Sequence, residues 1–266
     1  MDGENTGWQE PPLPEQIKSE DTEPRMSEAA TLGGIFFDPG STFEDLRRKP
    51  RFVMALLISI VLATTFSFAF SYKLGDEGIK RFFIEQLDKN DRTASLDPEA
   101  KQSALNLQLT IMKVVRFAVP VFFIIITAIG ALLYWGGAKA FGGTGNFMHA
   151  VSVWVYSSFP PLVIGTIANL IILVFKSADD IDFAVDQRGL LHANPSMFLD
   201  GKSMPVIATL ASTLDLFMIW GWVLAAIGLR KTNKLSSGSA WAIVIILALL
   251  MIVFRVIGAA GSGNVN

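Results

Sequence analysis

The stretch FVMALLISIVLATTFSFAFSY, residues Phe52–Tyr72, decides the fold class of this chain. It contains 21 consecutive uncharged residues between Arg51 and Lys73. A helix needs about 20 apolar residues to cross the roughly 30 Å hydrocarbon core of a bilayer. Backbone groups without hydrogen-bond partners cost several kcal/mol each in that core, so an apolar run of this length is predicted to be a transmembrane helix.

Further apolar stretches of helical length follow along the chain. We predict spans at about residues 52–72, 117–138, 150–175, 204–229 and 239–257. The predicted fold class is therefore an all-α integral membrane protein, a bundle of five transmembrane helices with short interfacial helices. An odd number of spans places the two termini on opposite sides of the membrane.

Composition supports lipid as the solvent and excludes several kinds of chemistry. Of 266 residues, 51% are hydrophobic and only 17% are charged, whereas soluble domains carry about 25% charged residues. Cysteine is absent, which excludes disulfides, thiolate nucleophiles and cysteine-based metal sites. The two histidines, His149 and His192, do not form a metal-binding spacing, so we predict no metal site.

The N-terminal segment, residues 1–31, is predicted to be a disordered acidic tail. Its first 30 residues hold eight acids and two bases, with four prolines and no apolar core of a signal peptide. A solubilising leader is favoured over a docking motif. The transmembrane domain would then comprise residues 32–258.

The distribution of Lys and Arg indicates the orientation of the spans. Four basic residues at positions 47–51 precede the first span, at the level of the lipid headgroups, which predicts a cytoplasmic N-terminus. The basic link 230–239 falls on the same side, and the acidic link 176–202 falls outside. The link 73–116 disagrees, because it holds eight bases against seven acids, but its length and near-neutrality weaken its influence.

Short helices are predicted in the links. The sequence Ser-Thr-Phe-Glu at 41–44 is typical of a capping box that opens a helix ending at Pro50. Apolar residues at helical spacing over 79–87 predict an amphipathic helix lying on the membrane. Asp97 and Pro98 form a helix start, from which one long helix is predicted to continue into the second span.

No catalytic constellation is visible in the sequence. There is no H-E-x-x-H motif, no phosphate-binding G-x-x-x-x-G-K loop and no pair of carboxylates inside a span. The glycine-rich run Gly142–Gly145 is not preceded by a strand, and we interpret it as a turn between spans. We therefore predict no enzyme activity, no catalytic residue, no cofactor and no nucleic-acid partner.

Asp215 is the one acidic residue within a predicted span, which makes it a functional hypothesis. It lies 14 residues from Leu229, or roughly 21 Å along a helix, and Arg255 lies 15 residues from Ala240, or roughly 22 Å. This shared level predicts an intramembrane Asp215–Arg255 ion pair that fixes helix register. Two alternatives stay open: a transport or proton-relay role, and a protonated Asp215 beside an Arg255 that reaches the headgroups.

Pro160 and Pro161 predict a helix kink in the third span, near Asn169. Broken helices of this kind expose backbone carbonyls to ions in transporters. A kink whose freed backbone groups are satisfied by neighbouring helices is the favoured interpretation.

Three groups of residues together resemble the Yip family, the Ypt/Rab-interacting membrane proteins, in its bacterial branch. The first is Ile-Phe-Phe-Asp-Pro at 35–39, followed by Phe43, Leu46 and Pro50. The others are Phe-Gly-Gly-Thr-Gly-Asn-Phe at 141–147 and Trp-Val-Tyr-Ser-Ser-Phe-Pro at 154–160. The resemblance covers about residues 35–257 and rests on arrangement more than on any single motif.

This resemblance implies five spans, a cytoplasmic N-terminus and residence in the bacterial cytoplasmic (inner) membrane. In eukaryotes the family is linked to vesicle trafficking, recruitment of small GTPases and shaping of endomembranes. The chain lacks a good copy of the Asp-Leu-Tyr-Gly-Pro motif of that branch. Small-GTPase binding is accordingly not expected.

Two functional hypotheses follow. The leading one is a non-enzymatic membrane scaffold, organiser or trafficking-type protein, whose partners are the lipid bilayer and other membrane proteins or a second copy of the chain. The rival is a small transporter or channel that uses Asp215. A scaffold should have a closed bundle with Asp215 paired, whereas a transporter should have a water-accessible cavity that reaches Asp215 from one side.

The orientation is testable because the chain has no native cysteine. Single cysteines at Ser27 and Ser236 should be shielded from a membrane-impermeant thiol reagent in intact cells, while one at Ser95 should react. Labelling at Ser27 without labelling at Ser95 would invert the predicted orientation.

Overall fold

The computed structural model describes residues 23–89, 91–181, 183–186, 189–191, 193–199 and 204–261. Within these ranges the regular elements are helices, as the predicted fold class requires. The helices are α1 (Glu28–Phe37), α2 (Pro39–Arg48), α3 (Val53–Lys89), α4 (Asp91–Ala94), α5 (Pro98–Ala140), α6 (Phe147–Phe175), η1 (Ala178–Asp180), α7 (Phe183–Asp186), η2 (Pro195–Phe198), α8 (Pro205–Ser212), α9 (Leu216–Asn233) and α10 (Ser237–Gly261). Four of the described helices, α3, α5, α6 and α10, are long and apolar enough to cross a membrane.

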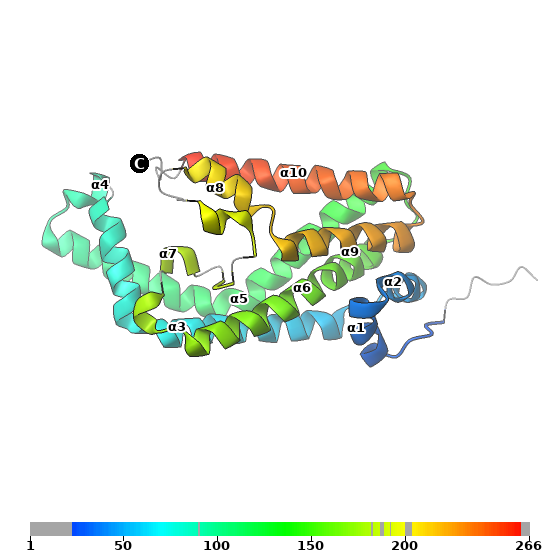
Figure 1. Ribbon diagram of the computed structural model, residues 1–266, viewed down its shortest axis with the longest axis horizontal. Coiled ribbons are helices and arrows are strands. Elements are labelled where there is room, and N and C mark those ends of the chain that lie inside the picture. The colour runs from blue at the N-terminus through cyan, green and yellow to red at the C-terminus, as the bar shows by residue number, and fades with distance from the viewer. Residues whose placement is uncertain are drawn as a thin grey trace, which may run out of the picture.

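The long helices run side by side along the longest axis of the molecule (Figure 1). Helix α6 is central, because it packs against α3, α5 and α9. Its buried side chains Val153, Tyr156 and Phe159 contribute to the main core. Helices α1 and α2 lie at one end of the bundle, which we call the proximal end, and α4 lies at the opposite, distal end (Figure 1).

The predicted span 204–229 is not a single helix. Helix α8 ends at Ser212, and α9 begins only at Leu216. The chain leaves the helical path because the Asp215 side chain caps α9, where it accepts hydrogen bonds from the backbone N–H groups of Phe217 and Met218. The predicted span 204–229 is thus divided between two helices, and α9 is 18 residues long, roughly 27 Å.

The amphipathic segment predicted at 79–87 is the distal part of α3. Gly75 separates it from the membrane span, with φ 68° and ψ 171°, a backbone conformation that favours glycine. Beyond that break, Ile79 is buried, and Phe82 packs 4.7 Å from the ring of Phe183. Part of the apolar face of this segment therefore packs on protein, and its position on the membrane surface stays a prediction.

The helix start at Asp97 and Pro98 is confirmed. The Asp97 side chain accepts the N–H of Ala100 at 2.8 Å, and Pro98 is the first helical residue. From there α5 continues for 43 residues to Ala140, through Pro120. This helix is roughly 64 Å long, about twice the thickness of the hydrocarbon core.

The ordered N-terminal region begins earlier than predicted. Residues 1–22 of the predicted tail lie outside the described residues. Its last part is structured, because Ser27 caps α1 by accepting the N–H of Ala30. Helix α2 also begins at Pro39, before the predicted capping box, since Asp38 accepts the N–H of Ser41 at 3.1 Å. Hydrogen bonds from Ser41 hold the pKa of Asp38 below its ordinary value, so this cap stays charged at neutral pH.

A buried ion cluster holds α1 and α2 together. The carboxylate of Asp45, a residue only 1% exposed, accepts a hydrogen bond from the guanidinium of Arg51, and Arg48 lies 3.7 Å away. Arg51 also donates to the carbonyl oxygen of Met26 at 2.7 Å and to Thr31 Oγ1 at 2.9 Å. Two bases of the predicted headgroup cluster thus bind a protein carboxylate. We call α1 and α2 the N-terminal layer.

The glycine-rich link 142–145 is a turn, as predicted. Gly142 has a φ of 78°, and the N–H of Thr144 donates to the carbonyl oxygen of Asn233 at 3.0 Å. A Cβ on Gly145 would lie only 2.2 Å from Asn233 Oδ1. Only glycine allows this close approach, which joins the α5–α6 turn to the α9–α10 turn.

A substitution at Gly228 of α9 tests how tightly Phe43 of the N-terminal layer packs against this helix. A Cβ at this position in α9 would lie 2.9 Å from the ring of Phe43 and from Val153 Cγ1. Because those neighbours are fully buried, we expect Gly228→Ala to cost about 1 to 3 kcal/mol of stability, measured by thermal unfolding in detergent.

The matched control is Gly136→Ala in α5, where an added Cβ meets nothing within 4 Å. This variant should be neutral or stabilised by up to about 1 kcal/mol through helix propensity. Equal stability of the two variants would contradict the tight packing of α2 on α9.

Candidate functional site: an intramembrane pocket

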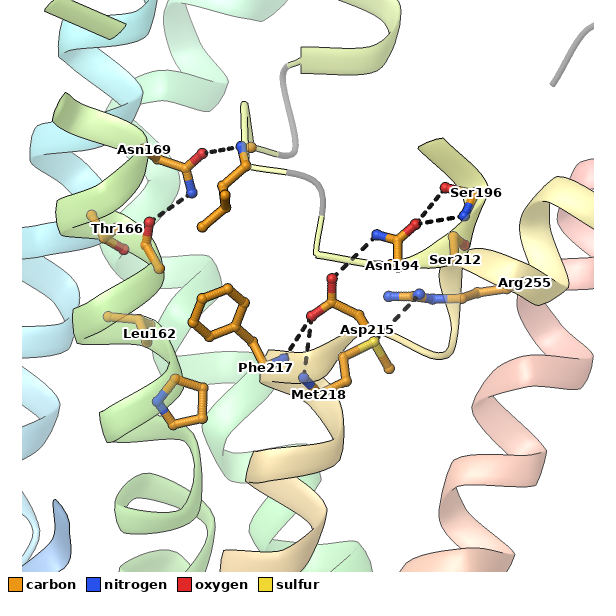
Figure 2. Close-up of a pocket in the computed structure, with 14 residues that line it drawn as sticks. Leu162, Thr166, Asn169, Asn194, Ser196, Ser212, Asp215, Phe217, Met218 and Arg255 are labelled. Carbon is orange, nitrogen blue, oxygen red and sulfur yellow. Dashed lines mark hydrogen bonds between the residues drawn. The ribbon is translucent and has the colours of Figure 1, made fainter. Parts of the chain in front are cut away.

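The break between α8 and α9 opens into a pocket of about 500 Å³. Its walls come from α6, from the link that contains η2, from the two broken helices and from α10 (Figure 2). The lining residues are Pro161, Leu162, Gly165, Thr166, Asn169, Gly189, Leu191, Asn194, Ser196, Ser212, Asp215, Phe217, Met218 and Arg255. Polar and charged groups thus meet at one place inside a bundle of apolar helices.

Asp215 is held by neutral hydrogen-bond donors. Its Oδ1 accepts the N–H groups of Phe217 at 2.9 Å and Met218 at 3.3 Å, and its Oδ2 accepts Asn194 Nδ2 at 3.2 Å (Figure 2). A carboxylate at a helix N-terminus is stabilised by the unpaired N–H groups and the helix dipole. The capping of α9 therefore offsets part of the cost of an acid within the bundle.

Asn169 of α6 holds the opposite wall. Its Oδ1 accepts the backbone N–H groups of Leu190 at 2.6 Å and Leu191 at 2.7 Å, and its Nδ2 donates to Gly165 at 2.8 Å. One amide side chain thus attaches an irregular segment of the α6–α8 link to the bundle. In the sequence Asn169 was noted only as a polar residue near the prolines.

Contacts between the helices fix the level of the pocket. Lys73, the first charge after the 52–72 stretch, lies with Nζ 3.4 Å from the carbonyl oxygen of Val174. Helices α3 and α6 both run from the proximal to the distal end (Figure 1). A residue of α6 is therefore level with the α3 residue about 101 positions earlier.

Helix α9 runs in the opposite direction beside α6. A Cβ on Gly221 would lie 3.5 Å from the carbonyl oxygen of Ser157 and 3.9 Å from Pro161 Cγ. Six residues further towards the distal end, Asp215 is therefore level with about residue 165 of α6 and about residue 64 of α3. This level is close to the middle of the 52–72 stretch, and the pocket is lined by residues of α6 from Pro161 to Asn169, on both sides of that level.

Arg255 enters the pocket from α10 (Figure 2). Its Nη1 lies 3.9 Å from Met218 Sδ. In the part of the chain that the structure describes, no carboxylate lies within 4.0 Å of its guanidinium, so the predicted Asp215–Arg255 ion pair is not a direct contact. The two charges share one pocket and are separately engaged.

The two prolines of the predicted kink lie inside α6, which continues through both of them. Pro160 is buried in the bundle, and Pro161 lines the pocket. The kink itself stays a prediction.

Asn194, Ser196 and Ser212 were not predicted as site residues. Asn194 precedes Pro195 in a readable helix start, but nothing in the sequence indicates that its amide reaches Asp215 across the fold. The hydroxyls are already bonded, Ser196 to Asn194 Oδ1 and Ser212 to the carbonyl oxygen of Thr209. In the described ranges, neither of these hydrogen bonds joins the hydroxyl to a His, Asp or Glu side chain.

The pocket is chemically suited to holding a polar or charged group. In the described ranges, no three His, Cys, Asp or Glu side chains gather as metal ligands. What the pocket offers is one carboxylate, one guanidinium, and amide and hydroxyl groups on the other walls. These groups are suited to binding a ligand by hydrogen bonds and charge.

Long apolar helices around this pocket define a multi-pass integral membrane protein. The sequence profile of the Yip1 domain matches residues 33–258, so the chain belongs to the Yip1 family, and the resemblance inferred from the three motifs is confirmed. A relative is the membrane protein YknW of Bacillus subtilis (strain 168), 28% identical over 244 residues that cover 90% of this chain and 93% of the relative. No solved structure matches the chain.

A double-mutant cycle measures the coupling between the two charges. Because the two residues share a pocket and both contact Met218 without forming a direct ion pair, the coupling energy between Asp215→Leu and Arg255→Leu should lie near the low end, about 0.5 kcal/mol, of the range for neighbouring residues. Asp215→Leu alone should cost about 1 to 2 kcal/mol through the lost cap, and Asp215→Asn should recover most of it, since asparagine also caps helices. A strong recovery in the double variant would instead establish the predicted ion pair.

Proposed function

We propose that this chain is a non-enzymatic membrane organiser of the Yip type, residing in the bacterial inner membrane with its N-terminal layer on the cytoplasmic side. The N-terminal layer is the observation that supports this proposal. The partners it implies are the bilayer and other membrane proteins or a second copy of the chain. Binding of a small GTPase is not part of the proposal.

The N-terminal layer lies at the level where headgroups meet acyl chains. Phe36 of α1 packs against Phe159 of α6 and Trp220 of α9, at 5.9 and 6.4 Å between ring centroids. Its neighbour Phe37 is 91% exposed and faces away from the bundle core. Apolar side chains on a helix at the membrane interface enter the outer part of the hydrocarbon. Such insertion from one side expands one leaflet relative to the other.

This layer is fixed to the bundle and does not depend on binding to lipid. Phe43 and Leu46 of α2 are fully buried, and the Asp45–Arg51 pair is shielded beneath α1. Removing one partner of a buried ion pair typically costs about 3 to 5 kcal/mol. The exposed apolar surface is therefore held at a constant depth, as an organiser of one leaflet requires.

Reconstitution into vesicles tests the proposal. Purified protein added at increasing ratio to vesicles of phosphatidylethanolamine and phosphatidylglycerol should reduce their mean diameter, measured by electron cryomicroscopy. Phe37→Ser should remove at least half of this effect, because it deletes the exposed apolar side chain.

The matched control is Phe175→Ser, which removes an aromatic side chain of similar exposure at the distal end of α6. It should retain the effect of the wild type. Vesicles with and without the wild-type protein that are equal in size would contradict the role of organiser.

A second candidate, transport through Asp215, is favoured by the pocket itself. The pocket lies beside a discontinuous helix near the middle of the apolar stretch, where secondary transporters bind their ions. Vesicles that contain a pH-sensitive dye should then show a proton leak under an imposed potential, and Asp215→Asn should abolish it. Equal leaks for both proteins and for empty vesicles would exclude proton transport.

A further inference from the structure

Arg255 lies where two cavities of different character meet. One is the polar pocket around Asp215, and the other is an apolar groove of about 470 Å³ between α5 and α10. The groove is lined by Leu133, Leu247, Leu250, Met251, Phe254 and Arg255. Arg255 is shared by both cavities, so a molecule that occupies the two together must be polar at one end and apolar at the other.

The charges of the polar pocket are opposite in sign and are not neutralised by each other. Arg255 has no carboxylate within 4.0 Å in the described ranges, and its Nη1 lies 3.9 Å from the thioether sulfur of Met218. A charge within the membrane is costly without a partner. A guanidinium presents several N–H donors in the geometry that suits a phosphate group.

Asp215 shows what else the ligand must carry. Its donors are two backbone N–H groups and one amide, all of them neutral, so its negative charge is not paired with a cation. A ligand that carried only negative charge would be repelled by this carboxylate. A headgroup that holds a phosphate and an ammonium group would meet both Arg255 and Asp215 with the opposite charge.

The apolar groove has the direction that an acyl chain requires. Ile243 of α10 packs on Gly137 of α5 nearer the proximal end, and residues 247–254 continue from there towards Arg255. The groove therefore extends from Arg255 towards the proximal side, whereas the polar pocket lies around the level of Asp215. A lipid whose headgroup enters the polar pocket would place one acyl chain along this groove.

We propose that this chain binds a phospholipid with a primary-amine headgroup. Its phosphate contacts Arg255, its ammonium group faces Asp215 and one acyl chain lies in the groove between α5 and α10. The pocket lies near the middle of the 52–72 stretch, so the bound headgroup sits deeper in the membrane than the headgroups of the surrounding lipids. This site is independent of the N-terminal layer and goes beyond the role of organiser.

Lipid retention tests the proposal on the full-length protein in detergent. After delipidation, dioleoyl phosphatidylethanolamine should bind at about one molecule per chain in native mass spectrometry and raise the midpoint of thermal unfolding. Dioleoyl phosphatidylglycerol, which lacks the amine, and dioleoyl phosphatidylcholine, whose quaternary amine has no N–H, should each bind at least about tenfold more weakly. Equal retention of the three lipids would overturn the proposal.

A water-soluble headgroup separates a lipid site from a site for a free phosphate ester. Glycerophosphoethanolamine carries both charges and no acyl chain, so it should bind at least about tenfold more weakly than the intact lipid. If it binds as tightly as the lipid, the groove contributes nothing and the lipid is not the ligand.

Two variants identify the charges that recognise the headgroup. Arg255→Gln should reduce retention of phosphatidylethanolamine at least about tenfold. Asp215→Asn keeps the helix cap and should shift the preference towards phosphatidylglycerol, because the repulsion of a purely anionic headgroup is gone. A merely structural role of Asp215 would leave the ratio of the two lipids unchanged, and that result would contradict the proposal.

Arg116→Gln is the matched control. Arg116 lies 5.9 Å above the ring of Phe68 and lines neither cavity, so its replacement should leave lipid retention as in the wild type. Both arginine variants are compared at equal stability in lipid-free detergent, determined by thermal unfolding. Equal losses of lipid in the two variants would show that any arginine near the membrane produces the effect, and the site would be rejected.

Discussion

A backbone amide without a partner in hydrocarbon costs several kcal/mol, and the architecture of this protein depends on that constraint. It explains the long helices, and it also explains how the chain is able to leave the helical path inside the bundle. At the α8–α9 break, Asp215 accepts two N–H groups, and the N–H of Leu216 donates to the carbonyl oxygen of Ala193. Opposite, Asn169 accepts two more from the α6–α8 link. The polar pocket exists because these side chains replace the hydrogen bonds that a continuous helix would have made.

The helical bundle could be predicted from the sequence because the length of an apolar run is a direct physical requirement for crossing a bilayer. The start of α5 at Asp97 was readable for a local reason, since a cap involves residues within one turn. The break before Asp215 was not predicted, because an isolated acid in an apolar run is equally compatible with an ion pair and with a helix cap. The Asp45–Arg51 cluster and the reach of Asn194 to Asp215 depend on tertiary contacts that no local pattern specifies.

The charged residues at the proximal end and those in the polar pocket differ in how their charges are paired. At the proximal end Asp45 is enclosed by cationic groups and by backbone donors, so its charge serves the packing of the N-terminal layer. Near the middle of the bundle, Asp215 and Arg255 line a pocket and are engaged only by weak or neutral partners. A satisfied ion cluster rigidifies a structure, whereas separated charges in a cavity remain available to a ligand. Membership of the Yip1 family is therefore compatible with a rigid N-terminal layer at the proximal end and a binding pocket within the bundle.

Helix α5 is long enough to extend well beyond the membrane span. The helix continues without interruption from the membrane span through the segment that precedes Arg116, which adds 18 residues, roughly 27 Å, on the distal side. Any change in the tilt of the span is magnified at the tip of this rod, where a rotation of about 10° displaces the end sideways by roughly 5 Å. A hydrophobic stretch that is longer than the local thickness of the bilayer is accommodated in part by tilting of the helix. A change in the tilt of the span would then move the distal end of α5 outside the membrane.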